Sequence, residues 1–256
     1  MSVWRLIKDG PLDGSENMAV DEALLYALEG SPSPPVLRLY RWKTPTLSIG
    51  RLQEDERLSR LSLPVVRRIT GGRAVLHDSE ITYSIVVPAS HALYAGGILG
   101  AYQAISSCIA SAFKGLNIDA RMSRARVGRG AGRGSACFCA PSRHELTIDD
   151  KKIVGSAQRR LRNGFLQHGS ILTGFDEGLN GRVFGPGLNE VVTWLGEHAD
   201  VKDDVFEDML VAAFSEGLNA RFEPYELSPV ELTIKNSILE GYAASALANS
   251  AALQTK

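Results

Sequence analysis

The chain has 256 residues, 44% of them hydrophobic and 22% charged, which is an ordinary globular composition. The net charge of −1 provides no global field for nucleic acid or acidic membranes, so any electrostatic attraction must be local. No stretch approaches the roughly 18 apolar residues of a membrane span, the first residues lack the apolar segment of a signal peptide, and three cysteines imply no disulfide framework. We expect a cytoplasmic, thiol-reduced monomer with one domain over residues 1–256.

The first half of the chain predicts one helix and then a run of strands. A short strand over Trp4–Ile7 precedes a helix that Ser15 or Asn17 caps and that runs to about Glu29. Prolines within 31–35 end that stretch. Strands are expected over 36–42, 46–49, 64–70, 74–77 and 81–87, with Gly71-Gly72 as a hairpin-type turn.

The middle of the chain predicts a helix and a second group of strands. Apolar residues recur at helical spacing from Tyr102 to Leu116, and Gly115 is placed to end that helix. Cys108 lies on the apolar stripe, which predicts a buried thiol. A hairpin is expected to turn at Asp149-Asp150 between strands 145–148 and 152–156, and a further strand covers 165–172.

The C-terminal part is less regular. Segment 176–200 gives no clear assignment, and a helix is expected from Asp203 or Asp204. Pro229 and a capping-box Glu231 predict a last helix of about fifteen residues from about 228, with a tail that frays after about 246. Runs of antiparallel strands with helices between them predict an α+β fold, with a large mixed sheet flanked by helices.

Cys137 is the first candidate for chemistry. It follows a loop rich in arginine, and no Asp or Glu occurs between Asp119 and Glu145. Nearby cations stabilise a thiolate relative to a thiol. The pattern favours a nucleophilic cysteine that carries an acyl group, and a loop cysteine without a chemical role is the alternative. The loop arginines are Arg124, Arg126, Arg129 and Arg133.

The stretch 66–78 is the second candidate. Gly71 and Gly72 have no side chain, so a ligand can approach the main chain closely there. Arg67, Arg68 and Arg73 offer donors to a carbonyl, a carboxylate or a phosphate. The stretch is neither a Walker A sequence nor a dinucleotide fingerprint, and a glycine turn with solvated arginines is the alternative.

Two further motifs lie on predicted strands. Strand alternation places Lys151 and Lys152 on opposite faces, so one faces water and the other faces the covered side of the sheet or a cleft. A lysine in a partly buried site can shuttle protons, and two solvated hairpin lysines are the alternative. His168, next to Gly169, is either a donor to a ligand carbonyl or a structural histidine.

Metal and nucleic-acid interpretations are weaker. Cys137, Cys139 and His144 suggest zinc, but structural zinc needs four ligands and no second cysteine pair exists, so we expect no metal and no other cofactor. The evidence for a Cys-x-Cys redox pair is equally weak. The Arg-Gly segment 127–134 resembles an RNA-binding segment without the usual aromatic residues, so we expect no nucleic acid. A basic loop that attracts an acidic carrier protein is favoured.

Together these motifs resemble the biotin/lipoate protein ligase family, and within it the LipM-type octanoyltransferases. The resemblance covers nearly the whole chain, and its motifs follow one another in the family's order. One departure is Cys139, where the family often carries Asp; motif order favours Cys137 as the reactive thiol. The matching stretches are 17–26, 67–78, 137–142 with Glu145-Leu146, 152–158, 166–172 and 223–228.

The resemblance implies a class II synthetase-like α+β fold and an activity. Octanoyl would pass from octanoyl-acyl carrier protein to a lysine of a lipoyl domain, as in glycine cleavage H protein or a 2-oxoacid dehydrogenase E2 subunit. The resemblance also implies that Cys137 forms the acyl-thioester and that Lys152 moves protons. The transfer would need no ATP. Backbone N–H groups near Cys137 or Gly155 are candidates for stabilising the oxyanion. The residues implied in substrate binding are Arg68, Gly71, Gly72, Arg73, His77, Gly155, Ser156, His168 and Gly169.

Three alternatives remain open. ATP-dependent lipoate ligases look similar around the glycine loop, but they generally have three glycines where this chain has Gly71-Gly72-Arg73, and an Asn-Asp pair in place of the cysteine motif. An amidotransferase that moves octanoyl between lipoyl domains also uses a cysteine. A non-enzymatic RNA binder would use the Arg-Gly loop.

Overall fold

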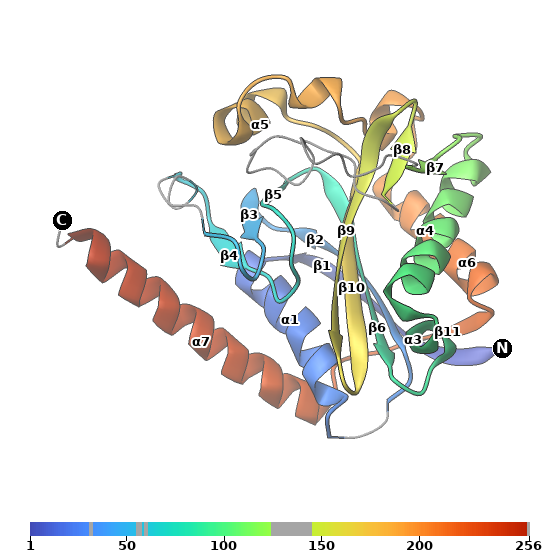
Figure 1. Ribbon diagram of the computed structural model, residues 1–256, viewed down its shortest axis with the longest axis horizontal. Helices are drawn as coiled ribbons and strands as arrows, with labels where there is room; N and C mark the ends of the chain where they lie inside the picture. The colour runs from blue at the N-terminus through green and yellow to red at the C-terminus, as the bar shows by residue number, and fades with distance from the viewer. Residues whose placement is uncertain (31–32, 55–57, 59–60, 124–144, 255–256) are drawn as a thin grey trace.

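The computed structural model describes residues 1–30, 33–54, 58, 61–123 and 145–254, and side chains to residue 243. Its main sheet has eight strands in the order β11-β1-β2-β6-β10-β9-β8-β7 (Figure 1). Strands β11, β1 and β2 run parallel, and the other neighbouring pairs are antiparallel, so the predicted mixed sheet is confirmed. The bounds are β1 Ser2–Leu12, β2 Val36–Trp42, β6 Glu80–Pro88, β7 Arg121–Met122, β8 Leu146–Ile148, β9 Lys151–Leu161, β10 Gly164–Leu172 and β11 Ala220–Pro224.

A second sheet of three strands has the order β4-β3-β5, with β4 Val65–Arg67, β3 Thr46–Ile49 and β5 Val75–His77. Strand β4 runs parallel to β3, and β5 runs antiparallel to it. The predicted hairpin at Gly71-Gly72 is therefore wrong, because β3 lies between the two strands that this loop joins. The sequence between β4 and β5 is too long for a tight turn and crosses over β3 instead.

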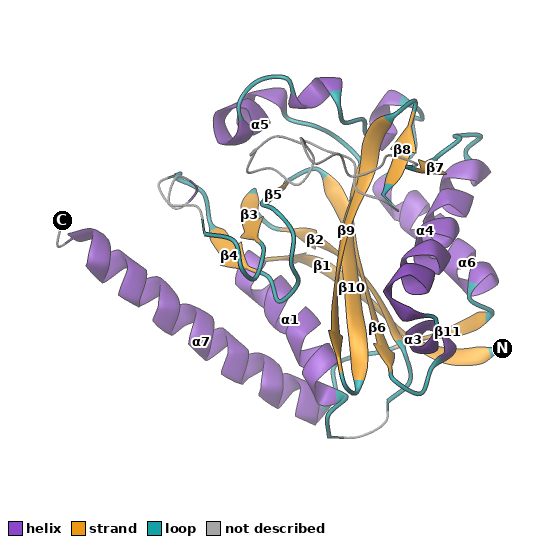
Figure 2. Ribbon diagram, viewed as in Figure 1, coloured by secondary structure: helices purple, strands orange, loops and turns teal. Residues whose placement is uncertain are grey.

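Helices cover both faces of the main sheet (Figure 2). Helices α4 (Gly97–Gly115) and α6 (Asp203–Gly217) pack together on one face, and α1 (Gly14–Ala27) lies on the other with α7 (Pro229–Gln254) against it. Shorter helices are α3 (Ala92–Ala95), α5 (Glu177–Phe184), η2 (Leu188–Glu190) and η3 (Leu195–Glu197), and the last three occupy the segment that gave no clear assignment.

Two helix ends differ from prediction. Helix α1 is capped by Asp13, whose side chain pairs with the third residue of the helix, Glu16, in a capping box. The predicted cap Asn17 is instead fully buried and donates to the backbone carbonyls of Leu12 and Arg41.

Helix α7 begins with the expected capping box, in which the Ser228 N–H donates to Glu231 Oε2 at 2.8 Å. It then continues to Gln254 rather than fraying after 246. Packing against α1 supports the helix, and its alanine-rich end has high helix propensity. In the described part of the chain, no helix is both long enough and apolar enough to span a bilayer.

Strand alternation gives the sheet two different faces. Leu37, Leu39 and Ile85 point into the larger core beneath α4 and α6, where Cys108 is 2% exposed as predicted. The other face, beneath α1, is apolar only toward one end of the strands, at residues such as Val36 and Leu166. Farther along the same face its residues become polar, and this is where the site forms.

Candidate functional site

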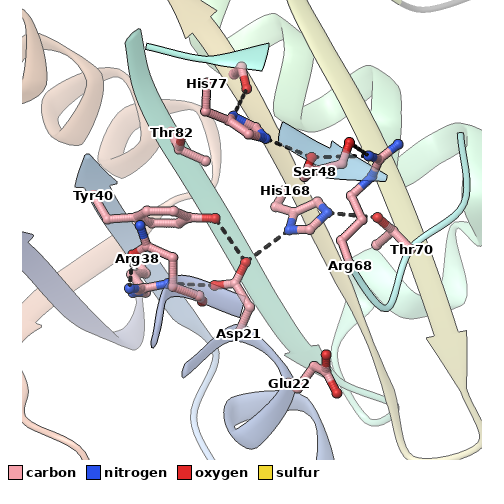
Figure 3. A network of polar contacts seen from close by, with 12 residues as sticks. Asp21, Glu22, Arg38, Tyr40, Ser48, Arg68, Thr70, His77, Thr82 and His168 are labelled. Carbon is pink, nitrogen blue, oxygen red and sulfur yellow. Dashed lines mark hydrogen bonds and ion pairs between the residues drawn. The ribbon is translucent and has the colours of Figure 1, made fainter. Parts of the chain in front are cut away.

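The site lies between α1, the polar part of the main sheet and the small sheet (Figure 3). Arg38 and Tyr40 on β2, Thr82 on β6 and His168 on β10 are all buried. Buried polar groups are costly without partners, so each must be satisfied within the fold. Two chains of hydrogen bonds satisfy them.

The first chain begins at Asp21 on α1. Its carboxylate accepts from Arg38 Nη1 at 2.9 Å and from the Tyr40 hydroxyl at 3.0 Å. His168 Nδ1 lies 2.9 Å from Asp21 Oδ2, and His168 Nε2 lies 2.7 Å from Thr70 Oγ1. The chain thus links α1 through β10 to the loop that carries the two glycines.

Protonation in this chain follows from burial and charge. Burial alone would raise the pKa of the Asp21 carboxyl, but the hydrogen bond from His168 and the positive charge of Arg38 outweigh it and leave the pKa below its ordinary value. Burial lowers the pKa of His168, although Asp21 opposes that shift. A neutral imidazole has one N–H, and a carboxylate only accepts, so Nδ1 donates to Asp21 and Nε2 accepts from the Thr70 hydroxyl.

The second chain begins at Glu80 on β6. His77 Nδ1 lies 2.8 Å from Glu80 Oε1, and His77 Nε2 lies 2.7 Å from Ser48 Oγ on β3. The Trp42 ring stacks on His77 with ring centroids 3.8 Å apart. Burial would raise the pKa of Glu80, but the electrostatic interaction with His77 and the hydrogen bonds from His77 and Thr82 lower it. The two carboxylates on this face are therefore ionised and paired at neutral pH.

Arg68 holds the glycine loop in place. Its Nη2 donates to the carbonyls of Gly71 at 2.9 Å and Arg73 at 2.6 Å, and its Nη1 donates to the Ser48 carbonyl at 2.9 Å. Gly72 has φ +97°, and a Cβ there would lie 2.8 Å from Arg68 Nη2. The guanidinium thus bonds to the protein's own backbone, and only glycine fits beneath it.

A pocket opens beside both chains of hydrogen bonds. It brings together six of the nine residues implied in substrate binding: Arg68, His77, Gly155, Ser156, His168 and Gly169. Gly71 and Gly72 line a separate neighbouring hollow, and Arg73 lines neither. The other lining residues, which were not among those implied in substrate binding, are Met18, Tyr40, Trp42, Ser48, Val75, Thr82, Ala157 and Ser170.

Gly169 brings strands β9 and β10 close together at the pocket wall. A Cβ at Gly169 would lie 2.5 Å from Ser156 Oγ and 2.7 Å from the Gly155 carbonyl oxygen. Ser156 Oγ is 2.7 Å from the Tyr83 hydroxyl, which in turn accepts from Gln167 Nε2 at 3.0 Å. The predicted glycine and serine therefore define one wall of the pocket.

Strand alternation predicted that one of the two lysines faces the covered side of the sheet, and the structure shows that this is Lys152. Its side chain is 1% exposed, and its Nζ lies 2.6 Å from Glu145 Oε1. Lys151 is only half-buried, with its Nζ 3.4 Å from the Asn189 carbonyl oxygen. Lys152 precedes Gly155 by three residues on β9, which is roughly 10 Å along an extended strand.

The predicted nucleophile Cys137, its neighbour Cys139, His144 and the arginine loop lie outside the described residues. Asp21 is the main participant that sequence reasoning missed. Its signal was a carboxylate on the buried face of α1, between Val20 and Ala23. A charge among buried apolar residues must be paired, but the sequence does not reveal its partner.

The family model described as "Lipoyl protein ligase A/B catalytic domain" matches residues 13–215. The chain belongs to this family. It is 39% identical to the octanoyltransferase LipM of Kyrpidia tusciae, with 95% of this chain and 97% of the relative covered. It is 36% identical to octanoyltransferase LipM of Bacillus subtilis, over 93% and 94% of the two chains, and 35% identical to that of Staphylococcus aureus, over 93% and 95%.

Solved structures of lipoate ligases share the fold. The putative lipoate protein ligase Ta0514 of T. acidophilum with bound lipoic acid superposes with a TM-score of 0.76 at 22% identity, over 94% of this chain and 95% of the other. A lipoate-protein ligase A bound with ATP gives a TM-score of 0.77, also at 22% identity, over 94% and 95% of the two chains. The predicted class of fold is therefore confirmed.

Proposed function

We propose that this chain is an octanoyltransferase of lipoate biosynthesis that moves an octanoyl group from octanoyl-acyl carrier protein to a lysine of a lipoyl domain. The proposed acceptors are the lipoyl domains of glycine cleavage H protein or of 2-oxoacid dehydrogenase E2 subunits. The LipM relatives, similar over nearly the full length, support octanoyl transfer.

The observation that carries the proposal is the pocket between α1, β10 and the small sheet. Met18, Trp42, Val75 and Ala157 give it apolar surface. The charged groups around it are bonded within the protein: Asp21 to Arg38 and His168, and Arg68 to backbone carbonyls. Such a lining suits an uncharged, flexible acyl chain, because no unpaired charge has to be desolvated when the chain enters.

The reaction divides into two steps with Cys137 as the nucleophile. In the first step the Cys137 thiolate attacks the donor thioester, the new C–S bond forms and the C–S bond to the carrier breaks. The Lys152 ammonium gives a proton to the leaving carrier thiolate. In the second step the acceptor amine attacks the acyl-enzyme, a C–N bond forms and the C–S bond to Cys137 breaks. The neutral Lys152 amine takes the proton that the acceptor amine loses, which restores the ammonium and the thiolate.

Intact-mass spectrometry after mixing with octanoyl-acyl carrier protein tests this proposal. We expect the protein to gain one octanoyl group, which Cys137→Ala abolishes and the matched control Cys139→Ala retains. Adding a lipoyl domain should discharge the adduct onto the acceptor lysine. If the adduct disappears with Cys139→Ala and persists with Cys137→Ala, the nucleophile is Cys139.

The related activities give different results in the same assay. A ligase would release pyrophosphate from ATP in the presence of octanoate or lipoate. An amidotransferase would take octanoyl from octanoyl-H protein in preference to the carrier-bound thioester. Transfer from the carrier protein without ATP is the expected outcome.

A further inference from the structure

We infer that Glu145 is a positioning residue for acyl transfer: its carboxylate holds the Lys152 nitrogen in place through both protonation states of the reaction cycle. The inference rests on the proposed function, which assigns the proton transfers to Lys152. It adds a residue outside the pocket, directly before β8, the strand that pairs with the Lys152 strand β9.

The contact itself is short and enclosed. Glu145 Oε1 lies 2.6 Å from Lys152 Nζ, and the two side chains are 4% and 1% exposed. A hydrogen bond between two ionised groups is stronger than a neutral one, and solvent ions screen it little when it is buried. The position of the lysine nitrogen therefore depends on this carboxylate.

Strand pairing explains why the two side chains meet. Thr147 on β8 pairs with Lys152 on β9, and Glu145 precedes Thr147 by two residues. Residues two apart point to the same face, and diagonal neighbours on that face are within reach of long side chains. The register shifts between Leu146 and Thr147, which places an extra β9 residue beside this pair.

The backbones of both residues are also held. The Ser123 N–H donates to the Glu145 carbonyl at 2.8 Å. Lys152 lies beyond the last pairing of β9 with β10, and the segment 191–193 replaces β10 there. The Lys152 N–H donates to the Val191 carbonyl at 2.9 Å, and the Thr193 N–H donates to the Lys152 carbonyl at 3.0 Å. With both backbones anchored, the 2.6 Å contact helps to hold Nζ in place.

The chemistry of the two groups suits a nitrogen that alternates between ammonium and amine. An ionised carboxylate only accepts hydrogen bonds, and both forms of the lysine nitrogen carry an N–H to donate. The contact therefore survives loss of the proton. A buried ion pair is weak evidence of a stabilising role, because apolar residues of similar size often serve as well. Its position next to the proposed proton carrier points to a role in catalysis instead.

A double-mutant cycle with Glu145→Gln and Lys152→Met tests the inference in single-turnover acyl transfer. We expect Glu145→Gln to slow transfer roughly ten- to hundredfold, with the donor concentration for half-maximal rate changed less than about threefold. Lys152→Met should slow it by about 10²–10⁴-fold, and the double variant should be no slower than Lys152→Met. Glu145→Asp, which keeps the carboxylate, should be faster than Glu145→Gln.

Glu231→Gln is the matched control. Glu231 forms a second buried ion pair, with Arg5 Nη1 2.6 Å from its Oε1, and neither residue lines the pocket. This variant should lower the melting temperature and leave the transfer rate within about twofold of the wild type. If Glu145→Gln does not fold, Glu145→Asp and the double variant, which leaves no unpaired charge, still give the comparison.

The outcomes separate the two proposals. Transfer at the wild-type rate by folded Glu145→Gln overturns the inference and leaves the proposed function standing. Multiplicative effects of Glu145→Gln and Lys152→Met also overturn it, because the glutamate would then act through structure alone. A wild-type protein that never gains an octanoyl group contradicts the proposed function itself.

Discussion

Gly169 provides a sharp test of how closely strands β9 and β10 must approach at the pocket. A methyl group at this position would lie 2.5 Å from Ser156 Oγ, 2.7 Å from the Gly155 carbonyl oxygen and 2.8 Å from Tyr83 Cε1. The backbone oxygen cannot move without shifting β9, and Gly169 is paired directly with Ser156 across the two strands. Gly169→Ala therefore forces the pocket wall apart.

The expected cost is that of overpacking a buried site, about 2–3 kcal/mol of unfolding free energy. For a chain of this size each kcal/mol corresponds to about 2–4 °C, so the melting temperature should fall by roughly 4–12 °C. Urea unfolding gives the free energy, and octanoyl transfer measured well below the melting temperature should also slow because Ser156 lines the pocket.

Gly181 is a matched control on α5. Among the residues that the structure describes, no atom outside its chain neighbours and its own helix backbone lies within 4 Å of a Cβ built there. Gly181→Ala should keep or raise stability, by up to about 1 kcal/mol, because alanine favours a helix. If Gly169→Ala melts as high as Gly181→Ala, the contact distances at the β9–β10 interface do not limit the fold, and the reasoning fails.

Three further predictions concern buried charges and α7. Asp21→Asn should lower the unfolding free energy in urea by about 1.5–3 kcal/mol, because Arg38 and Tyr40 lose their charged acceptor while Asp9 still pairs with Arg38; a loss below about 1 kcal/mol would contradict this. The folded pKa values of Asp21 and Glu80 are lowered, so both carboxylates stabilise the fold fully above their ordinary pKa values of 3.8 and 4.5, and this stabilisation is lost as pH falls through the folded values. The unfolding free energy should therefore decrease from pH 7 to pH 3, and it should decrease less steeply in Asp21→Asn. Tyr242→Phe removes the hydroxyl that lies 2.7 Å from Glu22 Oε1 and 2.8 Å from the Arg67 carbonyl oxygen, and it should cost about 1 kcal/mol, with faster proteolysis within α7; unchanged cleavage would count against it.

Much of the local structure was predictable from neighbouring residues. Apolar spacing identified the helix that buries Cys108, and the capping-box glutamate marked the start of α7. Strand alternation predicted that one of Lys151 and Lys152 is covered, and it did not say which; the structure shows that Lys152 is buried and Lys151 half-buried. These features depend on periodicity and on backbone hydrogen bonds within a few residues, so a short window of sequence carries them.

The partners of the site residues were decided by tertiary structure. His168 is bonded to Asp21, which is 147 residues away in the chain, and it acts as a link between α1 and the glycine loop. Arg68 bonds to the loop's own carbonyls, a use that its sequence motif did not distinguish from ligand binding. Several side chains that line the pocket, such as Tyr40 and Ser48, lie outside every matching stretch.

The order of the strands shows the same division. Each strand of the small sheet was recognisable, yet β3 inserts between β4 and β5 where a hairpin was expected. Helix and strand propensity is a property of short segments, so the sequence alone determined the kinds of elements and the types of reactive residues. Which elements pair depends on closing long loops and on filling a shared core, and only the folded chain as a whole satisfies those conditions.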